Sequence, residues 1–215
     1  MIKEAVASSL VEVEAKLKAG ANRIELCENM HESGTTPSYG MVKIASDMCQ
    51  MYDAELAVMI RPRGGAFVYN WYEFVSMQAD IQQLKTLPID YFVFGCLTTE
   101  STLHQFQMQT LIHLAAPIRV VCHMAFDHIY PAGQSKALQQ LINLGVTRLL
   151  THGGPTQSNL FDNLPQLAKW VRQSKGQIEI MPGGGLNYEN LDALLELFPF
   201  QEVHGTHIVK TLIQY

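Results

Sequence analysis

The sequence predicts an α/β fold of the TIM type, a (β/α)8 barrel whose last helix is shortened or missing. Three observations favour it: eight short strand patterns alternate with seven helical ones, no change in composition divides the 215 residues, and polar residues gather where the strands end. Strict alternation of strands and helices predicts a parallel sheet, and eight units close more naturally into a barrel than into an open sheet. We therefore expect a single domain over residues 1–215.

The expected strands are short and rich in apolar residues. The fourth is apolar throughout, which is typical of a parallel sheet that is covered on both faces. In the third, Leu56, Val58 and Ile60 face one side of the sheet and Ala57 and Met59 the other, because side chains alternate along a strand. The eight strands are expected at 2–7, 23–29, 55–60, 91–94, 118–122, 148–151, 177–181 and 202–204.

The expected helices carry apolar residues at spacings of three and four. A serine at position 8 or 9 can cap the first helix, and Gly20 ends it. After the last strand, the tail 208–215 is barely long enough for an eighth helix, so a second subunit is a candidate to cover that flank. The seven helices are expected between Ser9 and Gly20, over 38–49, 71–87, 103–114 and 135–144, along a stripe from Leu160 to Val171, and from Asn187 to Phe198.

Polar and apolar residues alternate along the second strand. Arg23, Glu25 and Cys27 share one face, while Ile24 and Leu26 share the other. If helices cover the apolar face, the polar face points into the barrel, where a charge is costly unless it is paired. We interpret the inward arginine, carboxylate and thiol as the mark of a functional site.

Composition and net charge indicate the cellular compartment of the protein and exclude some classes of binding partner. The net charge of −5 argues against a general surface for nucleic acid or anionic membrane. No signal-peptide pattern opens the sequence, and no apolar run is long enough to span a bilayer. The four cysteines are far apart and form no C-x-x-C pair, which predicts reduced thiols in a cytoplasmic protein without a disulfide framework or structural zinc. These cysteines are Cys27, Cys49, Cys96 and Cys122.

Polar residues also stand at the carboxyl ends of most other strands. TIM-type barrels build their sites at these ends, whereas barrel interiors are otherwise packed with Val, Ile and Leu. One such residue alone is weak evidence, but residues that converge from six of the eight strands predict a site. They are Glu25 and Cys27, Arg61 and Arg63, His123 and Asp127, His152, the segment 182–185, and His204.

The residue types at these ends suggest roles. Glu25 and His123 are a candidate acid–base pair, and Cys27 is a candidate nucleophile or soft-metal ligand. Arg61 and Arg63 are candidates to clamp a phosphate or carboxylate, with Arg61 inward and Arg63 at the mouth. Alternatively, one of the two arginines pairs with Glu25 as a structural ion pair.

Three consecutive glycines, Gly183, Gly184 and Gly185, follow the seventh strand and precede a predicted helix. Bare backbone N–H groups and a helix dipole favour an anion at such a place. The alternative interpretation is a turn that needs positive φ angles. Both interpretations stay open at this point.

Several enzyme classes lack their motifs here. No lysine stands at a strand end, which argues against a Schiff-base aldolase. No H-x-H pair lies on the first strand and few carboxylates converge, which argues against a two-metal hydrolase, and no G-x-S-x-G elbow occurs. Whether the protein is an enzyme is therefore left open.

Several motifs follow one another along nearly the whole chain. The run of seven from Met59, M-I-R-P-R-G-G, is the most specific of them, and the others are 23–27 with 34–38, 94–95, His123 with 125–127, and 181–185. Together, and in this order, they resemble the copper homeostasis protein CutC family. The resemblance implies a TIM-type barrel, a cytoplasmic location, a homo-oligomer, for which we expect a dimer, and a role in copper homeostasis.

The chain departs from this family pattern at several positions. Members often carry a second cysteine on the first strand, where this chain has Val6. The resemblance therefore implies a Cu(I) site with Cys27 as its main ligand and other soft donors beside it. Candidates for those donors are His123, Met59, Met124 and Met181, and further departures are Ala66, Met124 and His152.

Two functional hypotheses remain from the sequence. The first is a protein that binds Cu(I) through Cys27 without turnover. The second is an enzyme that acts on a small anionic, phosphorylated metabolite, held by Arg61 and 183–185, with Glu25 and His123 moving protons. A scaffold barrel with a degenerate site is a third interpretation.

Overall fold

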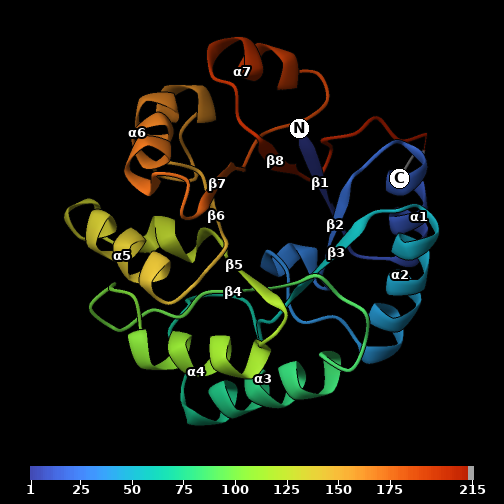
Figure 1. The fold of residues 1–215 in the computed structure, drawn as a ribbon, viewed down its shortest axis with the longest axis horizontal. Helices are drawn as coiled ribbons and strands as arrows, with labels where there is room; N and C mark the ends of the chain where they lie inside the picture. Colours follow the sequence, from blue (N-terminus) through green and yellow to red (C-terminus); the bar gives the residue numbers. More distant parts are fainter. Residues whose placement is uncertain (213–215) are drawn as a thin grey trace.

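Eight parallel strands surround a common axis in the computed structural model, which describes residues 1–212 (Figure 1). They pair in the order β7-β6-β5-β4-β3-β2-β1-β8, and β8 lies beside β7, so the sheet forms a nearly closed barrel. The predicted TIM-type fold is confirmed. The strands are β1 Ile2–Ala7, β2 Arg23–Leu26, β3 Glu55–Met59, β4 Tyr91–Phe94, β5 Arg119–Cys122, β6 Arg148–Thr151, β7 Glu179–Pro182 and β8 Glu202–Gly205.

Within residues 1–212, seven α-helices form a ring outside the strands (Figure 1). Within 206–212 no helix follows β8, as predicted, and the last three residues of the predicted tail lie outside the described residues. Among residues 1–212, no helix is both long and apolar enough to cross a membrane. The helices are α1 Leu10–Lys18, α2 Tyr39–Met51, α3 Trp71–Leu84, α4 Gln105–Ala115, α5 Pro131–Asn143, α6 Leu164–Ser174 and α7 Leu191–Leu197.

Two helices begin at other residues than expected, one because a proline starts it and one because a short 3-10 turn precedes it. Helix α5 begins at Pro131, earlier than expected, because proline suits the first helical position. Helix α6 begins only at Leu164, since the stretch before it forms the 3-10 turn Leu160–Asn163. Two further 3-10 turns, Met30–Glu32 and Met124–His128, follow β2 and β5 and shape the barrel mouth.

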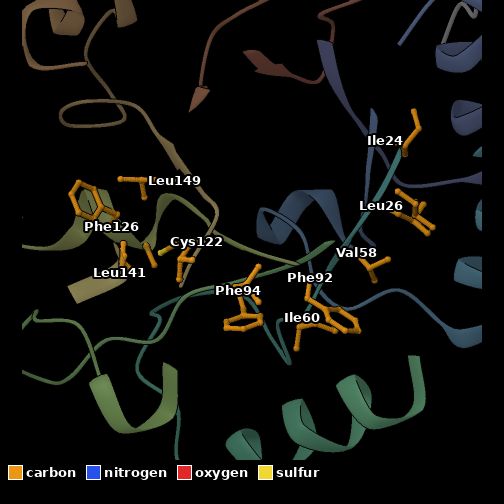
Figure 2. Packing of buried hydrophobic residues seen from close by; sticks show 14 of the residues in the cluster. Ile24, Leu26, Val58, Ile60, Phe92, Phe94, Cys122, Phe126, Leu141 and Leu149 are labelled. Atoms are coloured by element: carbon orange, nitrogen blue, oxygen red, sulfur yellow. The ribbon is translucent and has the colours of Figure 1, made fainter. Parts of the chain in front are cut away.

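The main core lies between the sheet and the helices. Ile24, Val58, Ile60, Phe92 and Phe94 point from their strands toward this layer (Figure 2). A second, smaller cluster fills the barrel interior and includes the opposite face of β3. The predicted alternation along β3 is therefore confirmed. Each fully buried aliphatic or aromatic side chain contributes roughly 1.5–3 kcal/mol to folding.

A network of charges fills the amino-terminal end of the barrel. The Arg23 guanidinium lies 3.2 Å from Glu4, 2.7 Å from Glu55 and 2.8 Å from Glu202. Arg148 also pairs with Glu202. Arg23 faces inward, as the strand pattern predicts, but its charge is fully paired. We call this network the barrel floor; Arg23 belongs to it and not to a site at the mouth.

Candidate functional site

A cavity of about 440 Å³ opens at the carboxyl ends of the strands. We call it the mouth chamber. Its walls include Glu25 in β2 and Cys27 directly after it, Arg61 after β3, and His123 after β5. His204 of β8 and two of the three consecutive glycines complete the wall. The structure therefore brings together most of the residues that the sequence singled out.

One corner of the mouth chamber is lined by sulfur. The Sγ atom of Cys27 lies 3.2 Å from the Sδ atom of Met30 and 3.9 Å from the carbonyl oxygen of Ala7. Met59 and Met124 line the same chamber. Burial, with the nearby negative charge of Glu25, raises the pKa of the Cys27 thiol, so the thiol is protonated at neutral pH.

The chain places Met30 against Cys27 by a sharp local turn. Asn29 adopts a left-handed backbone conformation, with φ of 51°, and starts the 3-10 turn that carries Met30. Its side chain donates a hydrogen bond to the Thr35 hydroxyl at 2.8 Å, and Glu28 pairs with Thr35 through the backbone. This loop folds back on the end of β2. Sequence periodicity gives no signal for such a turn, and Met30 was not predicted as a site residue.

His123 presents a free ring nitrogen. Its Nδ1 accepts a hydrogen bond from the Ala125 backbone N–H at 3.2 Å, which places the proton of the neutral ring on Nε2. Among residues 1–212, Nε2 has no hydrogen-bond partner. Burial, reinforced by the positive charge of Arg61, lowers the pKa of His123 to about 3. The imidazole is therefore neutral across the physiological range and offers Nε2–H as a donor.

Glu25 shares its corner with a histidine held by a second carboxylate. His204 Nδ1 lies 2.8 Å from Glu4 Oε1, and His204 Nε2 lies 3.8 Å from Glu25 Oε2. Burial raises the pKa of Glu25 to about 7. For His204, burial lowers the pKa, but the charges of Glu25 and Glu4 outweigh it and the net direction is upward. The other oxygen of Glu25, Oε1, has no partner within 1–212.

These three acidic and histidine groups could also hold a cation. One ligand atom each from Glu4, Glu25 and His204 lies within 4.8 Å of the others. However, Glu4 already pairs with Arg23 and with His204. His204 was recognised at a strand end but was given no role, and Glu4 was missed. The signal available for Glu4 was a glutamate in the middle of a short strand whose only other charged residue is Lys3.

Arg61 points inward, as predicted, but most of its donors are already used. Its two terminal nitrogens donate to the carbonyl oxygens of Glu32, Ser33, Gly34 and Gly65, at 2.6, 3.2, 2.8 and 2.8 Å. A bidentate clamp on a phosphate is therefore not available. Among residues 1–212, no acidic side chain pairs with Arg61, so the alternative of an ion pair with Glu25 is not observed.

Arg63 does not lie at the mouth chamber, which corrects the predicted placement. It pairs with Glu73 at 2.6 Å and donates to three carbonyl oxygens of its own loop. Glu73 also caps the start of α3. Arg63 therefore fixes the loop after β3 to the next helix, and its donors are turned away from the chamber.

The three glycines form a turn and not a helix start. Gly184 and Gly185 line the chamber with φ angles of 87° and 88°, which favour glycine. Gly183 does not line it; its N–H donates to the Thr151 carbonyl at 3.1 Å. Helix α7 begins only at Leu191. The expected helix dipole beside these glycines is thus absent, and the turn that needs positive φ is the interpretation the structure supports.

Three further residues from the sequence analysis lie away from the chamber. His152 contacts the carbonyl oxygens of Gly183 and Ser158 at 3.0 and 3.1 Å. Asp127, which is half-buried, accepts hydrogen bonds from the Thr151 hydroxyl and the His152 backbone N–H. Met181 is buried in the barrel interior and does not line the chamber. These residues hold the strand ends and loops in place.

Comparison with known proteins identifies the family. The CutC family model matches residues 1–209. The chain belongs to the CutC family. A family protein CutC from Enterococcus faecalis is 39% identical over 209 residues, which cover 97% of this chain and all of the relative. The human copper homeostasis protein cutC homolog is 38% identical over 187 residues, covering 87% of this chain and 66% of the human protein.

A solved CutC structure has the same architecture. The crystal structure from Streptococcus agalactiae matches with a TM-score of 0.93 and 36% identity, and covers 97% of this chain and 100% of that chain. The family resemblance predicted from the sequence motifs is therefore confirmed. The barrel and its mouth chamber are those of a CutC family member.

Proposed function

We propose that this protein binds Cu(I) as part of copper homeostasis, with Cys27 as the principal ligand at the barrel mouth. The observation that carries the proposal is the contact between Cys27 Sγ and Met30 Sδ, 3.2 Å apart. Cu(I) prefers thiolate and thioether donors over oxygen. Relatives named copper homeostasis proteins support the same role.

The sulfur corner fits a soft ion although it holds one thiol. Val6 lines the chamber where members of the family often carry a second cysteine, so the position faces the site but offers no ligand. Met30, Met59 and Met124 are the thioether donors at hand. A site of one thiolate with thioethers binds Cu(I) less tightly than a site of two thiolates, and we expect moderate affinity.

Binding would displace a proton. The Cys27 thiol is protonated at neutral pH because burial raises its pKa. A thiol must lose its proton to act as a metal ligand, so Cu(I) affinity should rise with pH. The oxygen donors of Glu4 and Glu25 suit harder cations. We therefore place Cu(I) at the sulfur corner.

The phosphorylated-metabolite hypothesis finds less support. The terminal nitrogens of Arg61 are used by four carbonyl oxygens, and Arg63 pairs with Glu73 outside the chamber. No helix begins at the glycine turn. A phosphate group needs several free charge-assisted donors, and the chamber offers few.

We also propose that the protein acts in the cytoplasm as a homo-oligomer. All four cysteines are free and buried, which agrees with a reducing compartment. Within 206–212 no helix covers the flank after β8, which leaves room for a second copy. Size-exclusion chromatography with light scattering measures the number of copies directly, and a monomer would contradict the second part.

A competitive Cu(I) titration under reducing, anaerobic conditions tests the copper proposal. The wild type should bind one equivalent of Cu(I). Cys27→Ser should lose at least about 100-fold in Cu(I) affinity, since even the loss of a residue that only supports a metal ligand costs up to about 100-fold. Cys49→Ser is the matched control, since Cys49 is equally buried but belongs to the core outside the sheet. Arg61→Ala should leave Cu(I) binding nearly unchanged, and thermal melting checks that each variant folds.

Equal binding by Cys27→Ser and the wild type would overturn the copper proposal. So would an equal loss in Cys49→Ser and Cys27→Ser, because Cys49 does not line the chamber. A loss of Cu(I) affinity in Arg61→Ala alone, with Cys27→Ser unchanged, would also contradict the copper proposal and would point to an anion site.

A further inference from the structure

Polar groups of the mouth chamber outside its sulfur corner lack partners. Buried polar side-chain atoms are hydrogen-bonded in the great majority of cases, so exceptions that share one cavity require an explanation. Among residues 1–212, Glu25 Oε1 and His123 Nε2 are two such atoms, and both residues are at least 96% buried and line the chamber. Copper at Cys27 would use neither of them.

A buried positive charge lines the same chamber. Arg61 is 3% exposed and lines the chamber, and no carboxylate pairs with it within residues 1–212. Four carbonyl oxygens solvate its terminal nitrogens but carry no compensating charge. Phe67 lies against both the Arg61 guanidinium and the His123 ring, at 4.9 and 4.8 Å. A buried charge without a counter-ion is costly, and a bound anion would supply one.

The donors and acceptors define the ligand. His123 offers an N–H donor at Nε2, because its Nδ1 already accepts from Ala125. Glu25 offers an acceptor at Oε1. A matching ligand carries a negative oxygen toward Arg61 and His123 and a hydroxyl group toward Glu25. A small hydroxycarboxylate has both features.

The chamber is large enough for such a molecule. Its volume of about 440 Å³ lies within the range of cavities that bind small organic molecules, about 300–1,000 Å³. A bare Cu(I) ion would occupy only a small part of it. The low number of free donors favours a carboxylate over a phosphate group.

We propose that the mouth chamber binds a small 2-hydroxycarboxylate. Its carboxylate group balances the Arg61 charge and accepts the His123 Nε2–H, and its hydroxyl group donates to Glu25 Oε1. This inference goes beyond copper binding, because its contacts involve none of the sulfur ligands.

Ligand-observed NMR with copper-free protein tests the proposal. The probes are glycolate, L-lactate, D-lactate and glycerate, with propanoate as the carboxylate that lacks the hydroxyl group, and inorganic phosphate as the competing anion. At least one hydroxycarboxylate should bind with Kd below about 10 mM. Propanoate should bind about tenfold more weakly, the effect of one lost hydrogen bond.

Variants at His123 assign the binding to the chamber. His123→Phe removes the donor and should weaken binding about tenfold, while His123→Gln keeps an N–H donor and should retain most of it. His113→Phe is the control, because His113 is exposed on α4. Met30→Leu, which removes a thioether of the sulfur corner, should leave hydroxycarboxylate binding nearly unchanged, which separates this proposal from copper binding.

Three results would overturn the proposal. They are the absence of binding by all four hydroxycarboxylates, equal binding by the wild type and both His123 variants, and preference for phosphate over every carboxylate. Melting curves with saturating ligand provide a second measurement, since a ligand that binds the folded state raises the melting temperature. A rise in the wild type that disappears in His123→Phe is expected.

Discussion

The sulfur atoms of Cys27 and Met30 lie 3.2 Å apart at the end of β2. Only two residues separate them in the chain, and the left-handed turn at Asn29 brings them together. The pair therefore exists before any ion arrives, so binding needs little rearrangement of the loop. On this account the copper site is built locally, and the other strands contribute the walls around it.

Met30→Leu tests the contribution of the thioether. Leucine keeps the size of the side chain but lacks sulfur, so we expect Cu(I) affinity to fall about 10- to 100-fold. Stability should change little, because Met30 is 39% exposed. Met51→Leu, at the exposed end of α2, is the control in the same competitive titration. Identical affinities for the two variants would exclude Met30 as a ligand.

Two neighbouring glycines separate backbone strain from steric contact. A Cβ atom at Gly184 would lie 2.8 Å from His152 Nδ1, whereas one at Gly185 would meet no atom within 4 Å. Both have positive φ angles, so alanine at either position costs about 1 kcal/mol of backbone strain. Urea denaturation should show a larger loss for Gly184→Ala than for Gly185→Ala. Equal losses would mean that His152 moves aside freely.

The sequence was sufficient for the architecture. Alternating patterns placed eight strands and seven helices, and the bounds of Tyr91–Phe94 and Arg148–Thr151 were predicted to the residue. These patterns depend only on the residues of the element itself, because each strand or helix buries one face regardless of which elements pack against it. The inward direction of Glu25 and Arg61 followed from the same rule and their positions at strand ends.

Pairings across the barrel could not be predicted. His204 meets Glu4 from the far end of the chain, and Arg23 pairs with Glu202, contacts that depend on closure of the sheet. Arg63 was expected at the mouth, with Arg61 inward, but it pairs instead with Glu73, which caps the start of α3. The outward position of Arg63 is decided by this tertiary partner and not by strand pattern.

The charges of the barrel floor should matter for stability. Arg148 is 5% exposed, pairs with Glu202 and lies over the Tyr91 ring. Arg148→Met breaks a buried pair and should cost about 3–5 kcal/mol in urea denaturation. Asp47→Asn removes the exposed pair with Lys43 and should cost less than about 1 kcal/mol. A small loss for Arg148→Met would show that Arg23 alone balances Glu202.

Glu25 should make stability depend on pH. Its pKa of about 7 in the folded state lies above the ordinary value of 4.5. Between these two pH values, the carboxyl group is protonated in the folded state and ionised in the unfolded state. The stability that Glu25 contributes is therefore complete below about pH 4.5 and declines as pH rises through about 7. Glu25→Gln cannot titrate at this position, so its stability relative to wild type should rise over this interval. Parallel curves for the two proteins would contradict the raised pKa.

The X-ray absorption spectrum of the protein loaded with one equivalent of Cu(I) tests the central claim most directly. In the wild type, the first coordination shell should consist mainly of sulfur, from Cys27 and the thioethers beside it. The same measurement on Cys27→Ser should show a clear loss of sulfur from that shell. A wild-type shell made only of nitrogen and oxygen, or a shell unchanged in Cys27→Ser, would contradict a copper site at the sulfur corner.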